Sequence, residues 1–383
     1  MIKKQWIIML VLVLFAFGIF GCGQDTTGPD DEGPGEEEGT ILIGIMVPVT
    51  GAYSENGIDM ENAVKLAVNE INAAGGILGH TVVTTTGDDE CDPAKATAAA
   101  SKLVSEEVVG VVGGYCSGAT LPTLKIYGDA GIPLVVAAAN ATSLVEENPG
   151  WTFMINSTGD MQAENAIGWF EKQGVETIGL IDDGSAFATD LKMLTKQQWE
   201  AKGKIVLTDD TVTTGEQDFS ALVTTIMSAN PDGIYWTAYH AEGALIVRQL
   251  REAGYEGIII VADGSSAPAF IELAGPYADG VFCTAPPFAD LNPAAAEFVT
   301  NYKEMFNSDP GAYSGLTYDA MYLLADAIER AGSFDDTAIK DALAATDGFQ
   351  GISGEVMFTE KNTLGRSNFV ILVVEDGKWT FAE

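Results

Sequence analysis

The sequence predicts an α/β protein with two domains, each built on a parallel β-sheet that is covered by helices. From residue 41 onward, short apolar segments rich in β-branched residues alternate with helical segments, and strands alternating with helices of about 10–15 residues are typical of parallel sheets. Residues 40–383 are too many for one hydrophobic core and numerous enough for two. No internal repeat of solenoid length accompanies the alternation.

The first series of elements begins with residues 41–49, an apolar run that fits a buried strand. Apolar positions at helical spacing follow in residues 63–71, and two glycines at residues 75–76 end that helix. The series continues to a strand at residues 133–137 and a strand-end loop at residues 138–142.

A second series begins near residue 156. Its predicted strands are residues 177–181, 204–207, 233–237 and 257–262, and its predicted helices are residues 190–201, 219–228 and 242–253. The alternation breaks at Pro286 and Pro287. Helices are then expected at residues 293–306 and 317–330, and strands at residues 354–358, 368–374 and 379–381.

Two polar segments follow strands of the first series. Residues 88–93 read DDECDP and residues 113–120 read GGYCSGAT. Asp92 can cap a helix that begins at the following proline, and Ser117 can cap the next helix. A helix N-terminus at the carboxyl edge of a sheet favours an anion, and that edge is where open α/β sheets bind ligands.

The same two segments each contain a cysteine. If the strands at residues 82–86 and 108–112 are neighbours in a parallel sheet, Cys91 and Cys116 come together at its carboxyl edge. The residues leave a second interpretation equally open, in which both cysteines are reduced and buried in ordinary strand–helix turns. Cys283 lies in an apolar strand and is expected to be a buried free thiol.

The N-terminus has the pattern of a secretory signal, predicted for residues 1–21. Two lysines precede an apolar run at residues 6–20, which is shorter than the ~20 residues of a membrane span. A single N-terminal anchor helix is the alternative. The Gly-Cys ending resembles a bacterial lipobox, so Cys22 is expected to carry lipid and to hold an exported protein at the cell envelope, where disulfides form.

Residues 22–39 follow the predicted signal and are rich in Gly, Pro and acidic residues. From residue 23 to residue 39 there is no aliphatic or aromatic side chain, so this segment cannot bury enough surface to offset its ordering entropy. We expect a flexible linker between the lipid and the folded domains.

Composition and motifs argue against several functions. The net charge of -36 makes nucleic acid an improbable partner. The two histidines, His80 and His240, lie far apart and join no metal-ligand pattern, and the chain has no P-loop, GxSxG or HExxH motif. We therefore expect no metal, no cofactor and no enzymatic activity, although a catalytic pair among the 55 acidic residues remains an alternative.

Several segments together resemble the leucine/isoleucine/valine-binding proteins of bacterial ABC transporters. The similarity runs from residue 41 to about residue 358, and the combination of INAAGG (residues 71–76) with DDxCDP is specific for this family. Supporting segments are AVNEINAAGG at residues 67–76, TGEQDFS at residues 214–220, AYH at residues 238–240 and ADG at residues 262–264. The resemblance implies that Cys91 and Cys116 form a disulfide.

The resemblance also implies the type I periplasmic binding protein fold, with two Rossmann-like lobes joined by three hinge crossings around a ligand cleft. The first lobe is expected at residues 40–157 and 288–349, and the second at residues 158–287 and 350–383. The crossings are then expected near residues 156–159, 284–287 and 350–354.

Eight positions match ligand contacts of the family. They are Ser117, Ala138, Asn140, Phe187, Tyr239, Asp263, Tyr115 and Asn56. By resemblance, Ser117 holds the carboxylate of an amino acid, Asp263 pairs with its α-ammonium, and Ala138 contacts it through the main chain.

Several of these positions depart from the family pattern. Asn140 stands where threonine is usual, and Phe187 where a tyrosine is often found. Asp263 replaces a glutamate and keeps its charge on a shorter side chain. Asn56 replaces an aromatic residue that covers the ligand's side chain, and Tyr115 replaces an aliphatic one, so the family's usual ligand, leucine, is not assured.

The sequence therefore predicts a monomeric, lipid-anchored receptor that passes a branched-chain or related aliphatic amino acid to an ABC permease and ATPase. A free amino acid needs hydrogen-bond donors for its carboxylate and a carboxylate for its ammonium, and Ser117 and Asp263 supply both. The alternative is a sensory module of the same fold that feeds a signalling partner.

Overall fold

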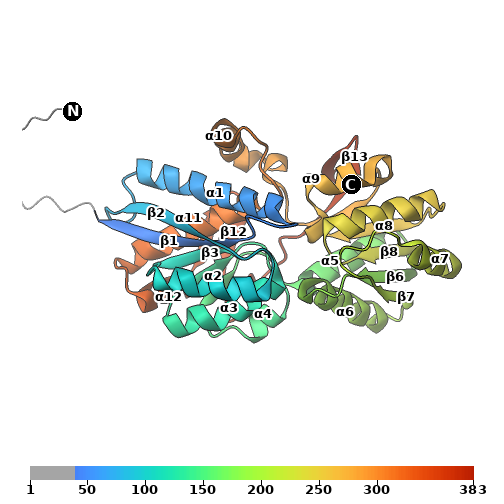
Figure 1. Cartoon of the computed structure of the whole chain (residues 1–383), viewed down its shortest axis with the longest axis horizontal. Coiled ribbons are helices and arrows are strands. Elements are labelled where there is room, and N and C mark those ends of the chain that lie inside the picture. Colours follow the sequence, from blue (N-terminus) through green and yellow to red (C-terminus); the bar gives the residue numbers. More distant parts are fainter. Residues whose placement is uncertain (1–38) are drawn as a thin grey trace, which may run out of the picture. The chain divides into compact units, whose positions relative to one another are not determined.

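The computed structural model describes residues 39–383. The predicted signal segment, Cys22 and all but the last residue of the predicted linker lie outside the described residues. Two large sheets organise the described part of the chain, and Figure 1 shows each of them between helices. No helix within residues 39–383 has both the length and the apolar character needed to cross a membrane.

The first sheet is parallel and has the strand order β2-β1-β3-β4-β5. Its strands are β1 (Thr40–Val47), β2 (Thr81–Asp88), β3 (Gly110–Gly113), β4 (Leu134–Val136) and β5 (Thr152–Met154). Its helices are α1 (Ser54–Ala73), α2 (Pro93–Ser105), α3 (Ser117–Ala130), α4 (Ser143–Glu146), α10 (Ala296–Phe306), α11 (Ser314–Ala331) and α12 (Asp336–Ala344). Helix α1 packs against α11, and α2 packs against α3 on the other side of the sheet (Figure 1).

The second sheet has the order β14-β13-β10-β9-β8-β6-β7. Its strands are β6 (Thr177–Asp182), β7 (Ile205–Thr211), β8 (Gly233–Trp236), β9 (Ile258–Ala262), β10 (Phe282–Ala285), β13 (Val370–Glu375) and β14 (Lys378–Phe381). Its helices are α5 (Gly159–Lys172), α6 (Ala186–Ala201), α7 (Ser220–Ala229), α8 (His240–Glu252) and α9 (Pro268–Ala274). Short 3-10 helices occupy Asp263–Ser265, Gly275–Ala278, Ala289–Leu291 and Pro293–Ala295. The predicted α/β class is confirmed, with an antiparallel addition where β13 joins β10.

The strand order differs from the arrangement considered above for the two cysteine-bearing segments. Strands β2 and β3 are not neighbours, because β1 pairs with both of them in parallel. This order has its topological switch between β1 and β3, where the helices that follow the two strands leave toward opposite faces of the sheet. A crevice therefore opens beside the carboxyl end of β3, where the residues after Gly113 lie.

The C-terminal segment also differs from expectation. Strands β11 (Asp347–Gly351) and β12 (Gly354–Met357) form a small antiparallel sheet, Phe358 packs its ring against Phe153 with centroids 5.4 Å apart, and Met154 bridges to Thr363. Residues 347–364 thus lie with the first sheet, and a crossing at residues 350–354 does not fit them.

The chain instead passes between the sheets after this segment. The Ser157 hydroxyl accepts the backbone N–H of Asn368 at 2.7 Å, and β13 follows at once in the second sheet. Contacts of Phe358 and Thr363 with β5, about 200 positions earlier in the chain, set this boundary. No local sequence pattern indicates these contacts. The other lobe boundaries stay predictions.

Candidate functional site

A small pocket lies at the carboxyl ends of strands from both sheets. Its volume is about 10 Å³, and Tyr115, Ser117, Ala138, Ala139, Asn140, Phe187, Tyr239, Asp263, Gly264 and Tyr313 line it. Seven of the eight positions expected from the sequence are among these residues. The eighth, Asn56, lies on α1 and is joined to the pocket through Tyr115, which it contacts directly. Among residues 39–383, no cluster of His, Cys, Asp and Glu side chains could hold a metal ion.

Helix α3 presents its N-terminus to this pocket. Cys116 occupies the N-cap and makes no side-chain cap, so Ser117 is the first helical residue and the expectation that it caps the helix is wrong. Its hydroxyl oxygen instead accepts the backbone N–H groups of Asn140 and Ala141, each at 3.2 Å. Because the oxygen accepts both bonds, the hydroxyl proton can be donated to an acceptor in the pocket, beside the positive end of the helix.

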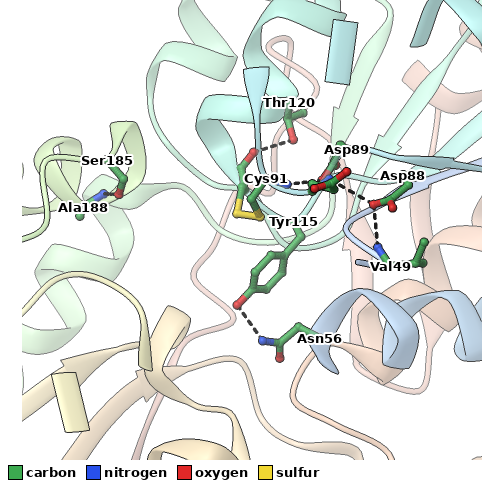
Figure 2. The surroundings of a disulfide bond; sticks show 11 residues. Val49, Asn56, Asp88, Asp89, Cys91, Tyr115, Thr120, Ser185 and Ala188 are labelled. Carbon is green, nitrogen blue, oxygen red and sulfur yellow. Dashed lines mark hydrogen bonds between the residues drawn. A yellow bond between two sulfur atoms is a disulfide. The ribbon is translucent and has the colours of Figure 1, made fainter. Parts of the chain in front are cut away.

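A disulfide holds this turn in place. Cys91 and Cys116 are bonded, with their Cα atoms 5.4 Å apart (Figure 2), as the resemblance implied. Cys91 reaches past β1 in a left-handed conformation with φ of 56°, and its N–H donates to Asp89 Oδ1 at 2.8 Å. This tight turn lets the cysteine meet a partner two strands away.

Two further expectations about single residues are confirmed. Asp92 caps α2 by accepting the N–H groups of Ala94 and Lys95. Cys283 is free and buried.

Asp263 supplies the pocket with a buried carboxylate. It is 2% exposed, and its Oδ1 accepts Gln162 Nε2 at 2.9 Å and Gly264 N at 3.1 Å. Burial raises the pKa of Asp263 to about 6, and the hydrogen bonds, chiefly that from Gln162, oppose the shift. No Lys or Arg side chain within residues 39–383 forms an ion pair with it. The site therefore holds a potential negative charge that lacks a positive partner.

Gln162 joins the two sides of the pocket. Its Oε1 accepts Asn140 Nδ2 at 2.8 Å while its Nε2 donates to Asp263, so an Asn–Gln–Asp chain runs from the β4 loop through α5 to the end of β9. Gln162 is fully buried. Sequence reasoning missed it, although its place on the apolar face of α5, beside Ala163 and Ala166, was a usable signal.

Aromatic rings form the remaining wall. Tyr239 lies 4.7 Å from Tyr53, 5.6 Å from Phe187 and 6.1 Å from Tyr115, measured between ring centroids. Tyr313 packs edge-on against Tyr115 at 5.5 Å. Sequence reasoning missed Tyr53 and Tyr313. Tyr53 carried a signal, since it follows the turn after the first strand, whereas the loop before α11 that holds Tyr313 carried none.

One further hydrogen bond fixes this wall. Asn56 Nδ2 donates to the Tyr115 hydroxyl at 3.0 Å (Figure 2). Both residues are buried, Asn56 at 6% and Tyr115 at 5% exposure. The bond links α1 to the loop that carries the start of α3.

Comparison with known sequences agrees with this arrangement. A family model described as periplasmic binding protein matches residues 40–378. The Leu/Ile/Val-binding protein BraC3 of Rhizobium johnstonii is 32% identical over 350 residues, which cover 90% of this chain and 94% of that protein. The Leu/Ile/Val-binding protein homolog 1 of Brucella suis is 30% identical over 347 residues, covering 90% of this chain and 93% of that protein.

Solved structures give the same result. The leucine-binding protein LivK of Thermotoga maritima superposes with a TM-score of 0.83 at 29% identity, over 90% of this chain and 98% of that one. The branched-chain amino acid transporter substrate-binding protein LivJ of Streptococcus pneumoniae, in complex with isoleucine, superposes with a TM-score of 0.83 at 26% identity, over 90% and 99%. With matched architecture across nearly the whole described body, this chain belongs to the Leu/Ile/Val-binding protein family of periplasmic binding proteins.

Proposed function

We propose that this protein is the extracytoplasmic solute-binding lipoprotein of an ABC importer and that it binds a branched-chain or related aliphatic amino acid. The observation that carries the proposal is the pairing of two opposite groups across one pocket. Ser117, at the start of α3, offers an O–H donor beside the positive end of a helix. Asp263, at the end of β9, offers a buried carboxylate that forms no ion pair with a Lys or Arg among residues 39–383.

This arrangement suits both charged ends of a zwitterion. The α-carboxylate accepts from the Ser117 hydroxyl and from N–H groups at the start of α3, and Ala138 contributes main-chain contacts. The α-ammonium donates to Asp263, whose orientation the Gln162 bond fixes. Asn140, Phe187 and Tyr239 line the same space. In a site that excludes water, such charge-assisted hydrogen bonds are at their strongest.

Binding is coupled to closure of the two lobes. Ser117 follows a strand of the first sheet and Asp263 follows a strand of the second, so only a closed cleft brings both to one ligand. The family consists of binding proteins and not enzymes. The amino acid is therefore released unchanged to the permease.

The lipid anchor is part of the proposal and rests on the Gly21-Cys22 ending of the apolar run. Its test is metabolic labelling with radioactive palmitate in cells that express the wild type or Cys22→Ser. Label on the wild type alone supports the anchor, and equal labelling of both removes it.

Ligand identification tests the proposed function as a whole. We expect native mass spectrometry of the purified protein to find an unmodified amino acid, and a thermal-shift screen of the amino acids to raise Tm with that compound. If all twenty amino acids leave Tm unchanged after bound material has been removed by unfolding and refolding, the proposal is wrong. Conversion of the ligand would likewise contradict it.

A further inference from the structure

A hydrogen-bonded pair, Asp190 and Thr142, joins the two lobes outside the pocket. Thr142 follows β4 of the first sheet, and Asp190 lies on α6, which packs against β6 and β7 of the second sheet. Asp190 Oδ2 accepts the Thr142 backbone N–H at 2.8 Å, and Asp190 Oδ1 accepts the Thr142 hydroxyl at 2.6 Å. Both oxygens of one carboxylate therefore bind a single residue of the opposite lobe.

The Thr142 hydroxyl serves this pair and not its own helix. Thr142 occupies the N-cap of α4, where a threonine side chain usually accepts a backbone N–H of the same helix. No such cap forms here, and the hydroxyl donates to Asp190 across the lobe boundary. Hydrogen bonds to an ionised carboxylate are stronger than those between neutral groups, so the pair is a specific contact between the lobes.

Asp190 also lies against the chain where it crosses from the first lobe to the second. Gly159 begins α5 directly after the crossing predicted near residues 156–159, and a Cβ atom at this glycine would lie 3.1 Å from Asp190 Oδ2. Because Thr142 and Asp190 move with different lobes, a change in the angle between the lobes has to alter their two hydrogen bonds.

The pair acts on the pocket through the loop that follows β4. Ala138 and Asn140 of this loop line the pocket, and Thr142 lies two positions further along. The first lobe holds the loop through the Asn140 N–H, which donates to Ser117 Oγ at 3.2 Å, and the second lobe holds it through Thr142. Asp190 is not among the residues that line the pocket, so its influence on a ligand is indirect.

We infer that Asp190 is a positioning residue and that its pair with Thr142 favours the closed cleft and thereby raises the affinity for the amino acid. A ligand that needs contacts from both lobes binds in proportion to the fraction of molecules that are closed. A contact that stabilises the closed form before binding increases that fraction. The inference rests on the proposed function, since it concerns closure around the same ligand.

The variant Asp190→Leu removes both hydrogen bonds and leaves every pocket residue in place. We measure its affinity by calorimetry with alanine, valine, leucine and isoleucine as probes, on protein freed of bound material, and its ligand-free radius of gyration by small-angle scattering. If the ligand-free wild type is mostly open, binding should weaken roughly tenfold, which corresponds to about 1.4 kcal/mol. If it is mostly closed, the ligand-free variant should have the larger radius.

The two possible failures are distinguishable. Affinity within twofold of the wild type together with an unchanged ligand-free radius overturns the inference and leaves the proposed function intact. Absence of binding of all four probes to the wild type contradicts the proposed function, and the inference is rejected with it.

Three further variants separate the hydrogen bonds from a general effect on α6. Asp190→Asn can keep both bonds, because its oxygen accepts the Thr142 N–H and its amide nitrogen donates to the hydroxyl, so its affinity should stay within threefold of the wild type. Binding by Asp190→Asn as weak as that by Asp190→Leu would contradict the assignment. Thr142→Val keeps the shape and loses the hydroxyl bond. It should weaken binding or enlarge the ligand-free radius to a smaller extent, and it decides the inference if Asp190→Leu does not fold. Glu200→Leu, at an exposed position near the other end of α6, is the matched control and should change neither quantity.

Discussion

The carboxylate of Asp263 is the group in the site that most needs a partner of opposite charge. It is buried, hydrogen-bonded by Gln162 and Gly264, and without an ion-pair partner in the described part of the chain. A bound α-ammonium would supply the missing charge. The charge of Asp263 therefore strengthens the binding of a ligand and lowers the stability of the ligand-free protein. Each effect gives a prediction.

The first prediction concerns binding. Asp263→Asn keeps the shape and loses the charge, and removing one member of a buried pair costs about 3–5 kcal/mol. At about 1.4 kcal/mol per tenfold, the amino acid should bind roughly two to three orders of magnitude more weakly in calorimetry. Binding within threefold of the wild type, or equal binding of the corresponding α-keto acid, would show that no ammonium is held there.

The second prediction concerns the stability of the ligand-free protein. The pKa of Asp263 is raised from 3.8 to about 6, first of all by burial, so between these values the folded state binds the proton more tightly than the unfolded state. Stability contributed by this group is complete below pH ~4 and falls as pH rises to ~6. The shift of about two pH units corresponds to ~3 kcal/mol.

Asp263→Asn removes that cost. In urea unfolding at pH 7.5 the ligand-free variant should therefore be more stable than the wild type by up to ~3 kcal/mol, and the difference should disappear near pH 4. Asp347→Asn, on an exposed position of β11, is the control. An Asp263→Asn variant that is less stable than the wild type at pH 7.5 would contradict the prediction.

At the scale of elements, the disulfide fixes the β2–α2 turn to the start of α3. It joins residues separated by 25 positions, and closing a loop of that length contributes ~3 kcal/mol in the chain-entropy view. The double variant Cys91→Ala with Cys116→Ala should lose about this much in urea unfolding. Since Cys116 directly precedes Ser117, ligand affinity should fall as well.

Thiol counting provides an independent check of the bridge. The Cys22→Ser protein, denatured without reductant, should show one free thiol, from Cys283. A count of three would mean that Cys91 and Cys116 are not bonded in solution.

At the scale of the whole molecule, the pocket is too small for free exchange of its ligand. A volume of about 10 Å³ compares with about 300–1,000 Å³ for usual ligand pockets. We expect the lobes to open by a hinge at the crossings and to close on the amino acid. Small-angle scattering should show a smaller radius of gyration at saturating ligand, and an unchanged radius would count against a hinge.

The order of the elements could be predicted from the sequence because short-range physics specifies it, and the residues of the candidate site could be predicted only through the resemblance to a known family. The run at residues 41–49 is apolar and β-branched, which favours a buried strand wherever it lies. Asp92 caps α2 because its carboxylate reaches N–H groups two and three residues away. The resemblance supplied the positions of Ser117 and Asp263, since their flanking motifs are local.

Only the tertiary structure decided which distant segments of the chain lie against one another. The sequence does not show that β1 separates β2 from β3, that Gln162 reaches Asp263 across 101 positions, or that Tyr313 and Tyr53 complete the aromatic wall. Nor does it show that residues 347–364 stay with the first sheet. Sequence periodicity reports which side of a strand or helix is buried, whereas the partner buried against that side is chosen by packing of the whole chain. The identity of the family therefore follows from local motifs, and the set of residues that line the pocket follows from how distant segments pack together.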